Sequence, residues 1–572
     1  MSSSKVSKTL YKSCNLVYNH IIENTKGEIV NNKRVFIKML VLGVIFALPY
    51  VFSFLWPLSW IALIPFIYFL TEHCVKAKKR KAYLWGFGFG LGYYLVMYHW
   101  FINFYPMEFA GVTKPAAALL VVVCWVGLAL VQAIEFGFVT LIYRALSPRA
   151  DKPFLCAGVI TAIWVLFEWQ QNFFWRGVPW ARLSVTQTAV PQILQSASLL
   201  GNLFISGMIV FVNAMLFYAL KHALTGKAPC GIKSLFATLK NQRTALFSGI
   251  AFGIFAVNLV FGCVRYVAFD DTSEKKLKAA VIQGNISSLD KWSGYDSIDT
   301  YISLTKECVN ETGAQLVVWP ETVIPTSINL SSFIMDEFAQ TADELDITLL
   351  VGSFAVEKND EGESVKYNAM YLFLPDGTVS DQRYYKQRPV PFGEYNPAAA
   401  ITEIFPVLKV LESFNDMRLS PGEGSQLLDS EFGKLGSIIC FDSIYESISR
   451  ASVNDGAEII TLSTNDSWFN DSAAVWQHNR HAVLRAIENG RYIVRAASTG
   501  VSSFISPTGD VLDTIAPLTE GYEVHEVYML SGRTVYSYVG NVFVYMCLGF
   551  VVGLAAYKIS LSIKRKALSK DI

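Results

Sequence analysis

The chain has 572 residues, of which 52% are hydrophobic and 17% charged, and its mean hydropathy is +0.35. Such a chain is too apolar for an ordinary soluble protein, so much of it must lie in lipid. The 48 basic and 47 acidic residues nearly balance, and no overall charge excess points to nucleic acid or to an acidic partner.

The N-terminal thirty-odd residues contain neither an apolar run nor a small-residue cleavage site, so we expect no removable signal peptide. The first uncharged segment, residues 39–70, would be about 48 Å long as a helix, which exceeds the roughly 30 Å core of a bilayer. Trp56, Pro57 and Ser59 lie near its middle. We therefore predict a helical hairpin with two short limbs.

Further apolar runs bring the predicted number of membrane spans to eight. They cover residues 82–104, 115–143, 154–167, 193–220, 244–263 and 535–557. Basic residues gather at 33–38, 76–81, 144–152, 221–243 and 564–566, whereas the loops 105–114 and 168–192 carry few of them. Because basic loops are typically cytoplasmic, we expect both termini in the cytoplasm and residues 266–534 outside. Loss of one hairpin limb would invert this assignment.

The segment between the seventh and eighth spans differs in composition, because charges return and short β-rich runs alternate with helical ones. Strands are predicted at 277–283, 315–319, 347–354, 369–374, 435–440, 459–463 and 501–505. Several of these runs are apolar throughout, as in strands that are buried on both faces. We therefore predict three parts: a tail with seven spans (1–265), a mixed α/β layered domain (266–534), and an eighth span with a tail (535–572).

Nine cysteines are present, but only Cys308 and Cys440 fall in the layered domain, which is therefore not a disulfide scaffold. Cys440 ends one predicted strand, Glu321 follows another, and Lys386 lies in a polar segment between them. A carboxylate could take the thiol proton, the thiolate could attack a carbonyl carbon, and an ammonium could stabilise the oxyanion. Each residue alone is weak evidence, because a lone cysteine is usually a small core residue and lone Glu or Lys side chains are usually solvated.

The flanking sequences make the set specific. They read Trp319-Pro-Glu321, Lys386 followed by Pro391-Phe-Gly-Glu-Tyr395, and Ile439-Cys-Phe-Asp442. In this order they resemble the nitrilase, or carbon-nitrogen hydrolase, superfamily, whose signature is a Glu/Lys/Cys triad on an α-β-β-α sandwich. Such a domain before the last of eight spans is similar to the apolipoprotein N-acyltransferase family.

The resemblance implies a role for each of these residues. Glu321 would be the proton acceptor, Lys386 the oxyanion stabiliser, Cys440 the nucleophile and Glu394 a supporting carboxylate. The family usually has Glu two residues after the cysteine, where this chain has the shorter Asp442.

The family's reaction would use two membrane-anchored substrates and no cofactor. A phospholipid would donate its sn-1 acyl chain to Cys440 as a thioester, and the α-amine of a diacylglyceryl-cysteine at an apolipoprotein N-terminus would accept that chain. The resemblance also implies a monomeric, multi-pass protein of a bacterial inner membrane, with the catalytic domain in the periplasm.

Residues 398–414 are unusually apolar for a loop between Lys386 and Cys440. We interpret them as a lipid-facing lid that includes Phe405 and Leu408. Phe392 and Trp468 are further candidates for contact with the substrate. An ordinary core helix is an equally good interpretation of 398–414.

Two histidines, His478 and His481, stand three residues apart, with Asp466 and Asp471 upstream. No third ligand follows at a convincing spacing, so we expect no metal site.

Arg485, Glu488 and Arg491 are spaced as neighbours on a helix, and we expect a structural ion-pair ladder there. Glu135 lies within an apolar run and Glu168 at the end of one. Acids in lipid are functional by default, although Glu168 could instead reach water.

Two other functions remain open. A membrane-anchored amidase would hydrolyse a small amide, with water rather than an amine resolving the acyl-enzyme. A catalytically silent scaffold would retain the fold alone. The eight predicted spans and the apolar segment 398–414 favour the acyltransferase over the amidase, and the intact triad argues against the scaffold.

Overall fold

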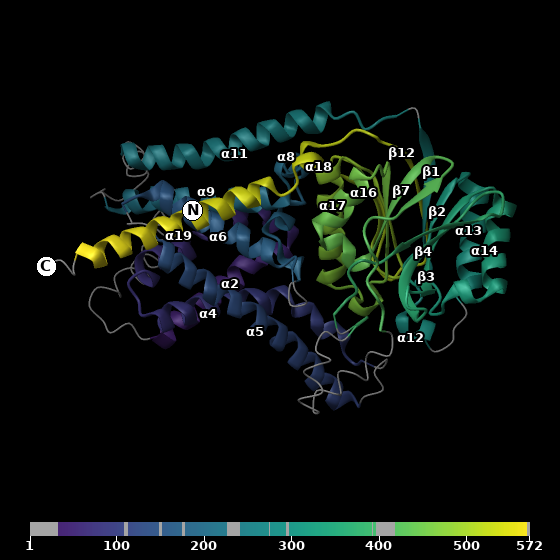
Figure 1. Cartoon of the computed structure of the whole chain (residues 1–572), viewed down its shortest axis with the longest axis horizontal. Helices are drawn as coiled ribbons and strands as arrows, with labels where there is room; N and C mark the ends of the chain where they lie inside the picture. The colour runs from purple at the N-terminus through teal and green to yellow at the C-terminus, as the bar shows by residue number, and fades with distance from the viewer. Residues whose placement is uncertain are drawn as a thin grey trace, which may run out of the picture.

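The computed structural model describes residues 32–107, 113–147, 151–173, 178–225, 241–273, 275–292, 297–391, 393–395 and 418–568. Long helices form one part of the molecule, and two sheets with covering helices form the other (Figure 1). We call these parts the bundle and the sandwich.

The bundle opens with the predicted hairpin. Its first limb is α2 (Asn32–Val51), and its second consists of η2 (Ser53–Trp60), α3 (Ile64–Tyr68) and η3 (Phe69–Cys74). The chain breaks at Phe52, so the turn comes four residues before the expected Trp56. The bundle continues with α4 (Lys79–Met97), η4 (His99–Phe104), α5 (Lys114–Leu146), α6 (Pro153–Gln170), α9 (Asn202–Thr225), α11 (Gln242–Ala268) and α19 (Val542–Leu568).

Seven helical segments in the described part of the chain are long and apolar enough to cross a membrane. The expected span 82–104 is divided between α4, which ends at Met97, and η4. Helix α4 is not among the seven, because it begins with three basic residues and contains four glycines. Its backbone nevertheless lies against α2. A Cβ atom on Gly43 would come within 2.0 Å of the Phe89 carbonyl oxygen, and one on Gly92 within 2.0 Å of Leu40. Small residues of this kind let membrane helices pack closely.

Two predicted spans have different bounds from those expected. Residues 193–220 do not form one helix. Two short helices, α7 (Pro191–Leu194) and α8 (Ala197–Leu200), come first, and Gly201, with a φ of 80°, ends α8 before α9 begins. Residues 535–557 are likewise divided at Gly540, with φ 58°, into α18 (Val535–Val539) and α19.

The sandwich contains two six-stranded sheets. The first has the order β12-β1-β2-β3-β4-β5 and the second β11-β10-β9-β8-β7-β6. Their bounds are β1 (Lys276–Gln283), β2 (Leu316–Val318), β3 (Thr348–Lys358), β4 (Ser364–Phe373), β5 (Val379–Tyr385), β6 (Leu427–Ser430), β7 (Gly433–Ile439), β8 (Ile459–Thr464), β9 (Ile493–Ala497), β10 (Ser502–Ile505), β11 (Val511–Ile515) and β12 (Gly521–Tyr528).

Helices complete the four layers. The first sheet is covered on its outer face by α13 (Ile298–Thr312) and α14 (Ser332–Leu345), and α16 (Glu446–Asn454) and α17 (Ala473–Asn489) lie between the second sheet and the bundle (Figure 1). Apolar residues from both sheets fill the space between them, among them Val281, Val318, Ile439 and Val494. The predicted α-β-β-α sandwich is therefore confirmed.

All seven predicted strands are present, and five others were not predicted. Four of these, β5, β6, β11 and β12, form the edges of the two sheets. Edge strands expose one side, so their sequences lack the continuous apolar run that marks a buried strand. The fifth, β9, is buried, but Arg495 interrupts its apolar pattern.

The parallel strands set the position of the site. Strands β1, β2 and β3 are mutually parallel in one sheet, and β7, β8 and β9 in the other. Glu321 follows β2 and Cys440 follows β7, so the carboxyl ends of the central strands bring the two together.

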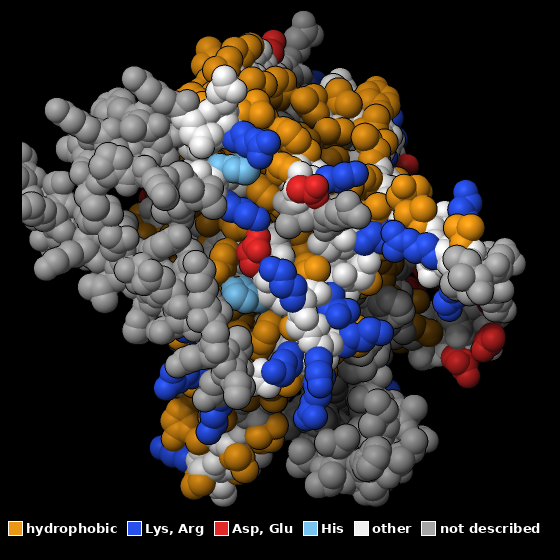
Figure 2. Space-filling model, turned by 90° about the vertical axis from the view of Figure 1, so that its left-hand side faces the viewer, with side chains coloured by type: hydrophobic (Ala, Val, Ile, Leu, Met, Phe, Trp, Pro, Cys, Tyr) orange, Lys and Arg blue, Asp and Glu red, His pale blue; other side chains and the backbone are white. Residues whose placement is uncertain are grey.

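The sandwich and the bundle meet along α17 through buried polar contacts. Trp180 Nε1 donates to Gln477 Oε1 at 2.7 Å, and the backbone N–H and side-chain amide of Asn202 donate to Glu488 Oε1 at 2.8 and 2.7 Å. At the opposite end of the bundle, Lys and Arg side chains gather on the surface (Figure 2).

Candidate active site

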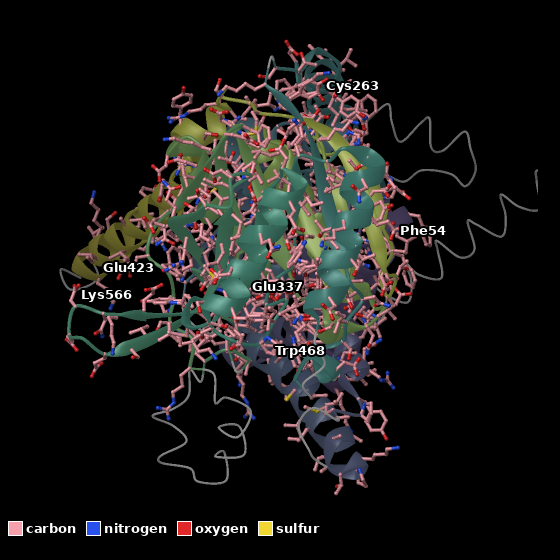
Figure 3. The ribbon with its side chains drawn as sticks, turned by 90° about the vertical axis from the view of Figure 1, so that its right-hand side faces the viewer. Phe54, Cys263, Glu337, Glu423, Trp468 and Lys566 are labelled. Atoms are coloured by element: carbon pink, nitrogen blue, oxygen red, sulfur yellow. The ribbon has the colours of Figure 1, made fainter. Side chains whose placement is uncertain are left out.

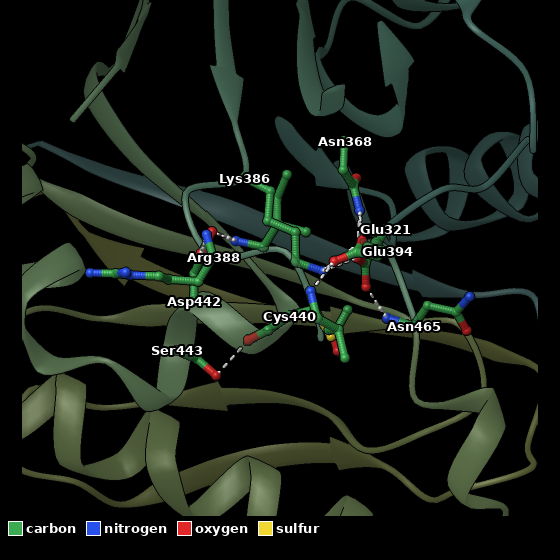
Figure 4. A network of polar contacts seen from close by, with 12 residues as sticks. Glu321, Asn368, Lys386, Arg388, Glu394, Cys440, Asp442, Ser443 and Asn465 are labelled. Carbon is green, nitrogen blue, oxygen red and sulfur yellow. Dashed lines mark hydrogen bonds and ion pairs between the residues drawn. The ribbon is translucent and has the colours of Figure 1, made fainter. Parts of the chain in front are cut away.

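The structure brings Glu321, Lys386, Glu394 and Cys440 into one polar network (Figure 4). Glu321 lies beyond the end of β2, Lys386 directly after β5, and Cys440 at the start of η10 (Cys440–Ile444) after β7. Side chains from both sheets therefore meet at one place, as the sequence predicted for the triad.

Glu321 is 4% exposed and has three hydrogen-bond donors. Its Oε1 accepts from Lys386 Nζ at 2.8 Å and from Asn368 Nδ2 at 2.7 Å, while Oε2 accepts from the Asn465 backbone N–H at 2.8 Å. A carboxylate has about four lone-pair sites. One acceptor position on Oε2 is thus left for a further proton.

Lys386 lies between two carboxylates. Its Nζ is 2.8 Å from Glu321 Oε1 and 2.9 Å from Glu394 Oε2. Burial alone would lower the pKa of Lys386, but Glu321 and Glu394 outweigh burial and hold the pKa well above its usual value. The amine is therefore a fixed ammonium. Asn368 Nδ2 also donates to Glu394 Oε1 at 3.0 Å and so joins the two acids.

Cys440 has a backbone φ of 49°, in the left-handed region that residues with a Cβ rarely adopt. Its side chain is partly exposed, so the turn presents the thiol at the surface of the site. Desolvation and the negative charge of Glu321 raise the pKa of Cys440, and Lys386 opposes them. A thiol with a raised pKa needs a base, and this arrangement provides one beside it.

A buried polar cluster supports this turn from the other side. Ser443 Oγ donates to the Cys440 carbonyl oxygen at 2.8 Å, and His478 Nε2 lies 3.1 Å from the same oxygen. His478 Nδ1 lies 2.8 Å from Asp466 Oδ1, and Arg495 donates to Asp466 Oδ2 at 2.7 Å. His478 and Arg495 hold the pKa of Asp466 well below its usual value, against the effect of burial.

Within the described residues, Cys440, Asp466 and His478 have potential metal-ligand atoms within 4.8 Å of one another. Both ring nitrogens of His478 already have polar neighbours, and Arg495 neutralises Asp466, so a cation would have to displace these contacts. The second histidine considered from the sequence, His481, has its Nε2 3.0 Å from the Trp180 carbonyl oxygen.

Asp442 is 1% exposed, and its carboxylate joins two segments of the site. Oδ2 accepts from Tyr384 at 2.8 Å and from the Ile439 N–H at 3.3 Å, while Oδ1 accepts from the Arg388 N–H at 2.8 Å. The acid therefore ties the backbone after Lys386 to the turn that carries Cys440.

The other candidates from the sequence lie apart from this network or outside the described residues. Phe392, Phe405 and Leu408, with the whole of 398–414, lie outside them. Trp468 is in η11 (Ser467–Phe469) and is labelled in the lower part of Figure 3. The ring of the next residue, Phe469, packs at 5.0 Å from that of Trp100 and at 6.2 Å from that of Trp180.

The expected ion-pair ladder forms only in part. Arg485 NH2 lies 2.8 Å from Glu488 Oε2, but Arg491 donates instead to the carbonyl oxygens of Ala457 and Gly532. In the bundle, Glu168 Oε1 accepts from Trp164 Nε1 at 2.9 Å, and Glu135 Oε2 accepts from Gln170 Nε2 at 2.9 Å.

Sequence reasoning did not assign Asn368, Asn465 or His478 to the site. A signal existed for Asn465 and His478, which lie in the motifs Asn465-Asp-Ser-Trp-Phe469 and Gln477-His478. No signal identified Asn368, a polar residue in the middle of β4, where the buried half of the strand begins.

Two family models match the chain. The model for the apolipoprotein N-acyltransferase N-terminal domain matches residues 42–215, and that for carbon-nitrogen hydrolase matches residues 278–532. Among solved structures, Saccharomyces cerevisiae Nit3, of the nitrilase superfamily, aligns with a TM-score of 0.35 and 21% identity, over 46% of this chain and 93% of its own.

Curated proteins match over nearly the whole length. The chain is 30% identical to an apolipoprotein N-acyltransferase of Geobacter metallireducens, over 94% of this chain and 96% of the relative. It is 28% identical to apolipoprotein N-acyltransferase 1 of Treponema denticola (86% and 89% covered) and 26% identical to the Pseudomonas aeruginosa protein (84% and 87% covered).

Proposed function

The chain belongs to the apolipoprotein N-acyltransferase family, and we propose that Cys440, Glu321 and Lys386 carry out the acyl transfer. It is an integral membrane enzyme of lipoprotein maturation. The observation that carries the proposal is that Glu321, held by three donors, keeps one acceptor position beside a thiol whose pKa is raised.

The first half-reaction forms the thioester. Glu321 takes the proton of the Cys440 thiol, and the thiolate attacks the carbonyl carbon of an acyl ester. The oxyanion that forms is stabilised by the Lys386 ammonium, which can turn towards it from its contact with Glu394. The ester C–O bond then breaks, and Glu321 returns the proton to the departing alkoxide. The donor in this proposal is a membrane phospholipid, which leaves as a lysophospholipid.

The second half-reaction uses the same groups in reverse. The neutral α-amine of the diacylglyceryl-cysteine attacks the thioester carbon, and Glu321 takes the proton that the nitrogen loses. The C–S bond breaks, and Cys440 recovers its proton from Glu321. Before and after each transfer, Glu394 holds the ammonium of Lys386, and Asn368 holds the base Glu321.

The proposed orientation in the membrane follows from the distribution of basic residues among the loops. Both termini lie in the cytoplasm, and the sandwich lies in the periplasm of a bacterial inner membrane, as expected from the basic loops. The parts of the chain are those of the sequence prediction: 1–265, 266–534 and 535–572. In this proposal the enzyme acts as a monomer. Residues 398–414, including Phe405 and Leu408, are its candidate lipid-facing lid, and Phe392 and Trp468 are further candidates for substrate contact.

Mass spectrometry of the purified protein tests this function. Incubation with phosphatidylethanolamine should add one acyl mass to the peptide that contains Cys440, and a diacylglyceryl peptide should remove it. Cys440→Ala should lose both steps while it remains folded, because a small partly exposed thiol contributes little to packing. N-acylation of the peptide by the folded Cys440→Ala variant would overturn the proposal.

A further inference from the structure

A second lysine lies close to the proposed base. Lys291 is on the short helix α12 (Ser288–Trp292) and is 1% exposed. Its Nζ donates to the Thr322 carbonyl oxygen at 2.8 Å. Thr322 directly follows Glu321 and has a φ of 45°, in the left-handed region that a β-branched residue rarely adopts. Lys291 therefore holds the strained turn from which Glu321 projects.

The balance of buried charge around Glu321 gives Lys291 a second role. Glu321 and Glu394 are two buried carboxylates that share the single ammonium of Lys386. A buried carboxylate without a compensating charge tends to take up a proton, and a protonated Glu321 could not act as a base. Burial lowers the pKa of Lys291 to about 8, and Glu321 opposes this effect. Lys291 is therefore still cationic at pH 7.

The helix α12 also contacts the second segment that holds Glu321. Ser288 Oγ is hydrogen-bonded to Ser467 Oγ, and Asn465 Nδ2 lies 3.4 Å from Ser288 Oγ. The Asn465 backbone N–H is itself a donor to Glu321 Oε2. One turn of helix thus supports the backbone on both sides of the base.

We propose that Lys291 is a positioning residue of the acyl transfer, which fixes the Thr322 turn and supplies the charge that keeps Glu321 ionised. This inference rests on the proposed role of Glu321 as the base. The two lysines then have different roles: Lys386 stabilises the oxyanion, and Lys291 holds Glu321. When Lys386 turns to the oxyanion, Lys291 still balances the charge of Glu321.

The test measures acyl-enzyme formation on Cys440 by mass spectrometry, with full-length protein in detergent and phosphatidylethanolamine as the donor, from pH 5 to 9. Lys291→Met removes the charge and keeps the length of the side chain, Lys291→Arg keeps the charge, and Lys276→Met removes an exposed ammonium from β1 as a control. Thermal unfolding of each variant shows whether it is folded.

We expect Lys291→Met to slow acylation at pH 7 by roughly tenfold or more and to move the acid limb of the pH profile to higher pH, by about one unit. The direction follows because a carboxylate takes up a proton more easily once the neighbouring cation is removed. The carboxyl of Asp442, which also titrates in the acid range, has Lys386 as its charged neighbour and should contribute equally in both proteins. Lys291→Arg should recover most of the rate and the original limb.

The inference is wrong if folded Lys291→Met has the rate and pH profile of the parent, or if the Met and Arg variants lose rate equally with no movement of the limb. If Lys291→Met does not fold, the pH profile of Lys291→Arg decides. An acid limb at the same pH as in the parent, without a titration near pH 8, supports the inference. An acid limb at a different pH contradicts it. Glu321→Gln in the same assay separates the two proposals, because acylation by this variant would overturn the role of Glu321 itself.

Discussion

At the scale of single residues, Asp442 holds two parts of the site together. Burial raises the pKa of Asp442 to about 6, against the field of Lys386. As the pH falls through about 6 the carboxyl takes up a proton and becomes a weaker acceptor for the N–H groups of Arg388 and Ile439. The backbone that carries Lys386 should then loosen.

Asp442→Asn should therefore slow acyl-enzyme formation by roughly tenfold to a hundredfold, because a misplacement of about 1 Å can cost that much. The parent should also lose rate as the pH falls through about 6, and the Asn variant should lack this step. Asp442→Glu keeps the charge and should be less impaired. The pH profile of thioester formation checks all three proteins, and a fully active Asn variant would mean that the acid does not contribute.

His478 supports the turn that carries Cys440. His478→Ala removes one partner of Asp466 Oδ1, which also accepts from Thr464, and one of the two groups beside the Cys440 carbonyl oxygen. The loss of these two buried contacts should lower the free energy of unfolding by about 1–3 kcal/mol and slow thioester formation. His525→Ala is a matched control, since that half-exposed ring pairs with Asp513 away from the site. Equal melting temperatures for the two variants would contradict this prediction.

At the scale of elements, apolar strands were predictable and polar ones were not. The seven predicted strands are mostly apolar runs, and several are apolar throughout, whereas β12 alternates polar and apolar residues at a sheet edge. The triad was predictable because Glu321 and Cys440 follow such runs. Lys291, Asn368 and Arg495 were not, because each bonds a group of the site that lies 29 or more residues away along the chain, on Thr322, Glu321 and Asp466 respectively. No local pattern reveals that a polar side chain will be satisfied by a distant group.

The helix α17 shows how much a buried polar pair with distant partners contributes to stability. Arg485 and Glu488 pair on its buried face, and Asn202 of the bundle donates to Glu488. Arg485→Met or Glu488→Leu alone should destabilise the protein by about 3–5 kcal/mol, because each leaves an uncompensated buried charge. The double variant should lose less than the sum of the two. Thermal melting of all four proteins in detergent checks this, and strict additivity would show that the charges do not interact.

At the scale of the whole molecule, the hairpin of residues 32–74 determines which side of the membrane the sandwich occupies. The basic loops predicted this sidedness, but the true ends of the helices depend on tertiary contacts, as at Gly201 and Gly540. Such a break depends on what packs there. Before the second break, Arg450 donates to the carbonyl oxygens of Tyr536 and Tyr538, both in α18.

Sidedness can be tested in intact cells. Asp360 lies in the exposed turn between β3 and β4, and Lys79 is exposed at the start of α4. A cysteine at position 360 should react with a thiol reagent that passes the outer membrane but not the inner one, whereas one at position 79 should react only after lysis. The parent chain gives the background from its own thiols. Reversed labelling would mean that the hairpin lacks one of its crossings.

The chain enters the sandwich through β1 and leaves it through β12, and these strands pair side by side, with Lys276 opposite Tyr528. Entry and exit are therefore neighbours in space, as in domains that tolerate insertion into a host chain. An ancestral soluble hydrolase could be captured between two membrane helices by a single gene insertion, without rethreading either partner. The same geometry makes this junction a cassette boundary for engineering, where one hydrolase could be exchanged for another above an unchanged set of helices.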